Sequence, residues 1–536
     1  MNYRIFSENE WVYPDSPVSC PEAKRTAELH TARGADVSFQ ILTDRMLCDG
    51  DTADARLSLA GCTVTLYRLV PAHVSENSGP KTLTTQNYEE VSHFVTRKAP
   101  FDVYEMTVPI GEGSFDPCPA AFYVRIDVER DAPVGCFTDT LTLTVNGESV
   151  EIPIVLTIHS AVVPPLSESK FHMINWIYYD TLARDHGVEP YSARYMEILG
   201  AYLENQRDMR NDYLMIPSGE PVRDENGRVI DFDFSHAKAV GALAREYGFR
   251  YLLGGFVITW LKWDAPDLYL LWEQETEVKS LEAYRQLKLY FTRAWECVKE
   301  CSWEDCYMQC LMDEPQFAND SSYRIVGAIC RKCMPGITVH DPVESYTLSG
   351  ALDVWVVKQA VYEKYPTEFR ALQDMGEEIW IYTCGFPAGH TMNRIIDLPL
   401  SASRLPMWMC YKYGCPGFLH WGYHCHNAEG HKDTCYRASR GRKFPAGNSF
   451  VVYNGDERPW YSVRGHLQRA AACDYELLIQ LDAHSREEAL AVVESVCRRF
   501  DEYDPSPEAL DKAHRVLLER LDAYVEQEAA ERQEKS

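Results

Sequence analysis

The chain has 536 residues, of which 46% are hydrophobic and 12% aromatic, and its formal net charge is −27. This length is too great for one ordinary core, so we expect two or three globular domains. The negative charge argues against nucleic acids and anionic membranes as partners. The N-terminus lacks the basic segment followed by an apolar one that marks a secretion signal. The 18 cysteines are therefore expected to be reduced thiols, and the protein is expected to be cytoplasmic.

Residues 1–165 carry short runs in which apolar and polar residues alternate. Such runs occur at 36–42, 62–68, 121–127, 138–145 and 149–158. Alternation with period two predicts strands, and Asn146-Gly147 between the last two runs predicts a tight hairpin turn. We therefore expect an N-terminal antiparallel β-sandwich that ends at the Pro164-Pro165 linker.

Residues 166–460 alternate between apolar strands and amphipathic helices. The predicted strands lie at 171–179, 212–216, 251–256, 306–312, 337–340, 354–358, 378–384 and 417–422. Helices are predicted between most of them, at 195–209, 235–247, 281–301 and 323–333. Eight such alternations over this length predict a (β/α)8 barrel of the TIM type. Residues 461–536 then form a helical extension, with helices expected at 463–481, 486–500 and 507–529.

Two adjacent carboxylates end the fourth predicted barrel strand. The apolar run 307–312 is followed by Asp313 and Glu314, and Pro315 stops the strand. Barrel enzymes hold their reacting groups at the C-terminal ends of strands. Because neighbouring carboxylates repel, one of them has a raised pKa and the other stays ionised, which suits acid/base catalysis. The alternative is a solvated acidic turn.

Aromatic residues stand near the ends of the last two predicted barrel strands. Tyr382 lies in strand seven, and Trp421 and Tyr423 lie at the end of strand eight. At a barrel mouth such side chains bind or stack on a sugar, although aromatic residues also fill barrel interiors. Gly422 beside Trp421 allows a ligand to approach closely.

No cofactor or metal site is predicted. The residues His424, Cys425, His426, His431 and Cys435 are of metal-binding types, but they lack the spacing of known zinc frames. The chain contains neither a Walker loop nor a G-x-G-x-x-G motif, so a nucleotide cofactor is not expected.

The sequence resembles glycoside hydrolase family 123, the β-N-acetylgalactosaminidases. The resemblance rests on Met312-Asp-Glu-Pro315, Ile381-Tyr-Thr-Cys384, Asn393-Arg-Ile-Ile-Asp-Leu-Pro399, Arg404-Leu-Pro-Met-Trp408, Gly417-Phe-Leu-His-Trp421, Val451-Val-Tyr-Asn-Gly455, Ser462-Val-Arg464 and Asp474-Tyr-Glu476. It covers nearly the whole chain up to Leu481. The chain departs from the pattern at His466, where relatives usually carry Glu, at Ala470-Ala471, and in the loop from Cys425 to Cys435.

The resemblance implies retaining, substrate-assisted hydrolysis of a terminal β-linked N-acetylhexosamine, GalNAc preferred, on an oligosaccharide or glycoconjugate. The 2-acetamido carbonyl attacks the anomeric carbon and gives an oxazolinium intermediate. Glu314 would be the acid/base, and Asp313 would hold the acetamido N–H. This accounts for the adjacency of the two acids, since an ordinary retaining enzyme needs a second carboxylate about 5 Å away across the sugar.

The resemblance also suggests residues that bind the sugar. Tyr382 would bind the acetamido carbonyl, and Trp421 would form the floor of the sugar subsite. Asn393 and Arg394 match the family pattern, and Arg394 either binds hydroxyls or pairs with Asp397. Trp176 on strand one is a further candidate.

Two alternatives stay open. One is a glycosidase of the same fold that acts on a sugar without an acetamido group, and the other is a non-catalytic carbohydrate-binding protein. The sequence leaves the oligomeric state and the leaving group undetermined.

Overall fold

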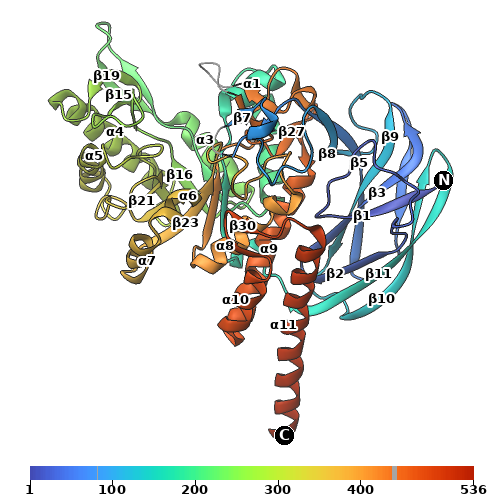
Figure 1. Cartoon of the computed structure of the whole chain (residues 1–536). Helices are drawn as coiled ribbons and strands as arrows, with labels where there is room; N and C mark the ends of the chain where they lie inside the picture. Colours follow the sequence, from blue (N-terminus) through green and yellow to red (C-terminus); the bar gives the residue numbers. More distant parts are fainter. Residues whose placement is uncertain (81–82, 438–442, 536) are drawn as a thin grey trace. The chain divides into compact units, whose positions relative to one another are not determined.

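The computed structural model describes residues 1–80, 83–437 and 443–535 (Figure 1). The chain divides into two compact units. Unit 1 comprises Met1–Phe171, Cys384–Tyr413 and Gly422–Ser536, and unit 2 comprises His172–Thr383 and Gly414–Trp421. This division differs from the three predicted ranges, because three segments of the range 166–460 belong with unit 1: 166–171, 384–413 and 422–460.

Two β-sheets form the N-terminal part of unit 1. The first has the order β1-β3-β9-β5-β8-β28-β27, and the second has the order β2-β11-β10-β4. Their bounds are β1 Tyr3–Ser7, β2 Ala27–Arg33, β3 Asp36–Leu47, β4 Ala53–Arg56, β5 Cys62–Val74, β8 Phe101–Pro109, β9 Cys118–Val128, β10 Gly135–Val145, β11 Glu148–Val162, β27 Val452–Asn454 and β28 Pro459–Ser462. One cluster of buried apolar side chains draws on both sheets.

The pairing in unit 1 departs from a purely antiparallel arrangement at one place. Strand β2 runs parallel to β11, whereas β10 and β11 form the antiparallel hairpin that the sequence predicts. Asn146 and Gly147 make the turn of this hairpin with φ values of 49° and 81°. Both values are positive, as a two-residue type I′ turn requires.

Strand β28 explains why the C-terminal segments belong with unit 1. It pairs antiparallel with β8, with Tyr461 opposite Thr107 and Ser462 opposite Met106. The chain therefore returns to the first sheet after the last barrel strand. This pairing joins residues far apart in the sequence, so local patterns gave no sign of it.

Four helices complete unit 1. They are α8 Leu405–Tyr413, α9 Val463–His484, α10 Arg486–Glu494 and α11 Pro507–Lys535. Helix α9 begins at Ser462, whose side chain accepts the N–H of Gly465. The predicted helix 486–500 is too long, because Cys497–Arg499 forms a short strand, β29, which pairs with β30, Glu502–Tyr503. The other short strands are β6 Asn77–Ser78, β7 Thr84–Thr85, β25 Cys435–Arg437 and β26 Lys443–Ala446.

Unit 2 is a nearly closed barrel of eight parallel strands. Their order is β12-β24-β23-β22-β21-β20-β16-β13. Their bounds are β12 His172–Asn175, β13 Tyr213–Met215, β16 Tyr251–Gly254, β20 Tyr307–Gln309, β21 Thr338–Val343, β22 Val354–Lys358, β23 Glu378–Thr383 and β24 Gly417–His420. Between the two end strands, the N–H of Asp212 donates to the carbonyl oxygen of Met173 at 3.2 Å. The eight predicted strand positions are confirmed.

Helices and short strands connect the barrel strands of unit 2 (Figure 1). The helices are α1 Tyr179–His186, α2 Ala193–Asp208, α3 Ser235–Glu246, α4 Leu281–Glu300, α5 Asp320–Cys333, α6 Gln359–Lys364 and α7 Pro366–Asp374. The short strands are β14 Glu220–Arg223, β15 Val229–Asp233, β17 Ile258–Thr259, β18 Tyr269–Leu270 and β19 Glu273–Glu277. In the described part of the chain, no helix is both long and apolar enough to cross a membrane.

Candidate active site

A buried carboxyl group helps to hold the segment after β20, in addition to backbone hydrogen bonds such as that from the Cys310 N–H to the Gly254 carbonyl oxygen at 3.1 Å. Strand β20 ends at Gln309, and the N–H of Leu311 then donates to both carboxyl oxygens of Asp341 at 3.0 Å. The N–H of Met312 also points to Oδ1 of Asp341, at 3.4 Å, and the Tyr323 hydroxyl donates to Oδ2 at 2.7 Å. Asp341 is fully buried, so it fixes the position from which the chain enters the two acids.

The backbone turns sharply at Glu314. This residue has a φ of 51°, in the left-handed region that a residue with a side chain seldom adopts. Its N–H donates to the carbonyl oxygen of Pro342 at 3.0 Å, which holds the turn. In a regular strand the side chains of Asp313 and Glu314 would face opposite sides of the sheet. The turn removes this restriction.

Two side chains from neighbouring barrel strands, Tyr382 of β23 and Lys358 of β22, contact the Glu314 carboxylate. The Tyr382 hydroxyl donates to its Oε1, and the Lys358 ammonium lies 3.1 Å from the same oxygen. Lys358 also pairs with Glu344, whose carboxylate accepts a hydrogen bond from Gln316 at 3.1 Å. The side chains of Glu314 and Lys358 are only 13% and 8% exposed, so this charge pair is well shielded from water.

Asp313 has the perturbed pKa of the pair. Loss of contact with water and the negative charge of Glu314 raise its pKa to about 8, and the Lys358 ammonium offsets part of this rise. At neutral pH the free protein therefore holds a proton on Asp313 beside the hydrogen-bonded Glu314. Two adjacent carboxyls that share one proton between them are suited to acid/base chemistry.

Trp176 and Trp421 lie at the C-terminal ends of two adjacent barrel strands. Trp176 follows β12 and is 8% exposed, and its ring meets that of Phe256 edge to face at 5.5 Å. Its indole Nε1–H is buried and has no hydrogen-bond partner among the residues that the structure describes. Trp421 follows β24 and is half-buried, with its ring 6.4 Å from that of Tyr178. The structure thus places Trp176, Trp421 and Tyr382 on the barrel strands or directly after them.

The other three predicted sugar-binding residues lie in unit 1 and are buried there. The Asn393 side chain donates to the carbonyl oxygen of Cys384 at 2.7 Å. Arg394 donates to Gln468 at 3.1 Å. Tyr423 is fully buried. These contacts have a structural role, and sugar binding by the three residues stays a prediction.

Lys358 and Glu344 were missed by the sequence reasoning. Each leaves one signal in the sequence: Lys358 is the only charge in the buried strand β22, and Glu344 follows directly after β21. A charge at the C-terminal end of a barrel strand indicates the reaction site.

The cysteine- and histidine-rich loop forms no metal centre within residues 1–80, 83–437 and 443–535, because no three His, Cys, Asp or Glu residues there come close enough to hold an ion. Cys425 and Cys435 are buried. The Nε2–H of His426 donates to the carbonyl oxygen of Val452 at 2.8 Å, and burial lowers the pKa of this ring to about 4.

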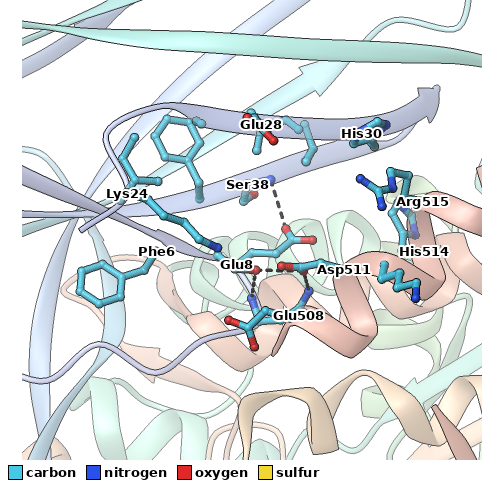
Figure 2. A pocket seen from close by; sticks show the side chains of 18 of the residues that line it. Phe6, Glu8, Lys24, Glu28, His30, Ser38, Glu508, Asp511, His514 and Arg515 are labelled. Atoms are coloured by element: carbon cyan, nitrogen blue, oxygen red, sulfur yellow. Dashed lines mark hydrogen bonds between the residues drawn. The ribbon is translucent and has the colours of Figure 1, made fainter. Parts of the chain in front are cut away.

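A cavity of about 510 Å³ in unit 1 is lined by charged side chains (Figure 2). Glu8 and Asp511 lie side by side in its wall, and both are hydrogen-bonded. Glu8 accepts the N–H of Ser38 at 3.1 Å and pairs with Arg404 at 2.6 Å. Asp511 accepts from the Asn9 amide at 2.7 Å. Glu8, Arg404 and Asp511 of the cavity wall thus take part in contacts within unit 1.

Residues that carry the family resemblance form the buried ion pairs of unit 1. Arg404 binds both carboxyl oxygens of Asp474, at 2.6 and 2.9 Å. Arg464 pairs with Glu105 at 2.7 Å, and both side chains are fully buried. Glu476 accepts the N–H of Phe171 at 2.9 Å. These motif residues therefore stabilise the fold of unit 1.

The departure at His466 also has a structural explanation. Its ring is stacked on those of Tyr123 and Tyr461, with centroids 4.5 and 4.4 Å away. Its Nε2 lies 3.2 Å from the Thr107 hydroxyl. An aromatic ring fits this buried stack, whereas an ionised Glu would need a cation there.

Comparison with known proteins decides the family. The model of the glycoside hydrolase 123 catalytic domain matches residues 176–481, which is more than half of the chain. The chain belongs to glycoside hydrolase family 123. This confirms the resemblance and makes the protein a glycosidase by class. No match was found among curated proteins.

A solved family 123 structure shares the fold. The family 123 glycoside hydrolase from Clostridium perfringens, studied for glycolipid glycan hydrolysis, aligns with a TM-score of 0.73 at 12% identity. The alignment covers 99% of this chain and 98% of that one. An endo-β-1,4-mannanase from Thermotoga petrophila aligns with a TM-score of 0.36 at 14% identity, over 58% of this chain and 78% of its own.

Proposed function

We propose that this protein hydrolyses terminal β-linked 2-acetamido-2-deoxyhexosides, GalNAc preferred, by a retaining, substrate-assisted mechanism. The observation that carries the proposal is the pair Asp313 and Glu314 after β20, in which Asp313 has a pKa of about 8 and Glu314 is held by Lys358 and Tyr382. The glycan substrate of the Clostridium perfringens relative supports the substrate class. The preference for GalNAc rests on the family resemblance.

The first step redistributes the shared proton. In the free protein it resides on Asp313, because burial and the neighbouring Glu314 raise the pKa of Asp313 to about 8. The acetamido N–H of the substrate donates to Asp313 and so favours its ionised form. The proton then passes to Glu314. The Lys358 ammonium disfavours protonation of Glu314, but it is also paired with Glu344, and the negative charge of Glu344 reduces this effect.

Protonated Glu314 is then the general acid. The acetamido carbonyl oxygen forms a bond to the anomeric carbon, the bond to the glycosidic oxygen breaks, and that oxygen takes the proton of Glu314. The positive charge of the oxazolinium ion is stabilised by the Asp313 carboxylate. In the second step Glu314 takes a proton from water, whose oxygen attacks the anomeric carbon and reforms the acetamido group with retained configuration.

The substrate contacts follow from positions at the barrel strand ends. The Tyr382 hydroxyl, which donates to Glu314 in the free protein, would turn to the acetamido carbonyl. The unpartnered Nε1–H of Trp176 would donate to a sugar hydroxyl. The half-buried Trp421 would form the apolar floor under the ring.

Glu344 supports a second candidate function. It is a further carboxylate on the same ammonium as Glu314, so it could be the nucleophile of an ordinary retaining glycosidase that acts on a sugar without an acetamido group. In that mechanism Glu344→Gln would abolish turnover. With substrate assistance, Glu344→Gln leaves measurable turnover.

The test compares 4-nitrophenyl β-GalNAc, β-GlcNAc and β-Gal side by side. We expect β-GalNAc to have the highest kcat/KM, β-GlcNAc to follow, and β-Gal to be inert. Equal cleavage of β-Gal and β-GalNAc would contradict substrate assistance and favour Glu344 as nucleophile. Cleavage of none of the three would favour a carbohydrate-binding protein.

A further inference from the structure

Two tryptophans are exposed or partly exposed in the segment that follows barrel strand β16. Trp263 is 39% exposed, and the neighbouring Leu261 is 49% exposed. The ring of Trp260 meets that of Trp263 edge to face, with the centroids 5.0 Å apart and the planes at 74°. Because aromatic side chains rarely face water in such a group without a use, this surface needs an explanation.

Trp263 lies next to the acid/base through one ammonium group. The Lys358 Nζ is 5.7 Å from the centre of the Trp263 ring, and it is 3.1 Å from Oε1 of Glu314. The same ammonium is 5.7 Å from the centre of the Tyr382 ring, which is buried. Lys358 thus contacts one buried ring and one exposed ring, and the exposed ring marks the side of Glu314 that substrate can reach.

The leaving group must lie on this side. A general acid within hydrogen-bond reach of the glycosidic oxygen also lies next to the first atoms of the leaving group. An exposed indole there offers a flat apolar face, which suits the C–H face of a pyranose ring. Lys358 itself is occupied by Glu314 and Glu344, so the indole is the group left to receive that ring.

We propose that Trp263 is the stacking platform of the leaving-group subsite, where it receives the first sugar ring of the leaving group. This inference rests on the proposed function. It adds a residue that recognises the part of the substrate beyond the scissile bond. The indole acts by contact with the leaving group, and its effect is absent for a substrate whose leaving group has no ring.

The experiment compares two substrates on the wild type and Trp263→Ala. One is a disaccharide of β-GalNAc on galactose, and the other is β-GalNAc fluoride, whose leaving group is a single atom. We expect Trp263→Ala to lower kcat/KM about tenfold on the disaccharide and to change it less than about twofold on the fluoride. Trp263→Phe should recover part of the loss. Tyr247→Ala removes an aromatic residue of similar exposure, 37%, at the end of α3, and should change neither value.

The outcomes separate the platform from other roles. Equal losses on both substrates would overturn the platform and indicate that the indole acts through Lys358. Unchanged kcat/KM on the disaccharide would overturn it as well. If the wild type cleaves neither GalNAc substrate, the proposed function itself fails, and this result is distinct from a failure of Trp263→Ala alone. Since Trp263 is exposed, the unfolding curve of the Trp263→Ala variant should match that of the wild type.

Discussion

The Lys358 ammonium lies 3.1 Å from Oε1 of Glu314, the residue that we propose as the acid/base. A positive charge at this distance favours the ionised carboxylate and so opposes its role as an acid. The opposition is reduced because Lys358 is shared with Glu344. The protonation of the site is therefore set by three carboxyl groups and one ammonium acting together.

Removal of this ammonium should change the pH dependence of catalysis. The alkaline limb of kcat/KM for wild type should lie near pH 8, where the raised pKa of Asp313 places the loss of the shared proton. Lys358 lowers that pKa, so in Lys358→Met the limb should move to higher pH. We also expect kcat/KM at pH 7 to fall about tenfold, because the Glu314 side chain loses the contact with Lys358 that holds it in position. Lys364→Met, on helix α6, is the matched control, and an unmoved limb in Lys358→Met would contradict this account.

Replacement of the acid/base should affect substrates according to their leaving groups. We expect Glu314→Gln to lower kcat by about 10²- to 10⁴-fold on a disaccharide, whose leaving oxygen needs a proton. The loss should be smaller on a 4-nitrophenyl glycoside, because nitrophenolate leaves without full protonation. Steady-state kinetics with both substrates measures the difference. Equal losses on both would show that Glu314 does not donate the proton.

Replacement of Asp313 should separate catalysis from stability. The folded protein binds the Asp313 proton more tightly than the unfolded chain, because burial raises its pKa to about 8. The stability contribution of this group is therefore full at low pH and is lost as the pH rises from about 4 to about 8. Asp313→Asn should be inactive, and its free energy of unfolding relative to wild type should increase over that interval. Denaturant titrations of both proteins at pH 5 and pH 8 test this. A variant that is less stable relative to wild type at pH 8 than at pH 5 would refute it.

The buried ion pair of unit 1 gives a prediction about folding. Arg464 and Glu105 are fully buried, and the Arg464 guanidinium also donates to the carbonyl oxygens of Arg394 and Gly447. We expect Arg464→Met to cost about 3–5 kcal/mol, because Glu105 is left as a buried charge without its partner. The double variant Arg464→Met with Glu105→Leu should recover part of this loss. A single variant as stable as wild type in denaturant unfolding would contradict the structural role of the pair.

The barrel could be predicted from sequence because its signals are local. Strands such as β22 and β23 are continuous apolar runs, and the carboxylates Asp313 and Glu314 stand where such a run ends. The division into units could not be predicted in the same way. It depends on the pairing of β28 with β8, which joins residues more than 300 positions apart and leaves no local pattern.

The site was predicted in part for a similar reason. Asp313, Glu314 and Tyr382 follow from strand ends and from the family resemblance. The contact between Lys358 and Glu314 depends on which strands are neighbours and on the turn at Glu314, where φ is 51°. Asn393 and Arg394 match the family pattern and make hydrogen bonds within unit 1, and sugar binding by them stays a prediction.

The central claim, that the substrate's acetamido group is the nucleophile, is tested most directly by weakening that nucleophile. The measurement is kcat/KM for 4-nitrophenyl β-GalNAc and its N-fluoroacetyl, N-difluoroacetyl and N-trifluoroacetyl analogues. Each fluorine withdraws electrons from the carbonyl oxygen, so we predict a steep stepwise fall along the series. A series with constant kcat/KM would contradict the mechanism and place the nucleophile on the protein.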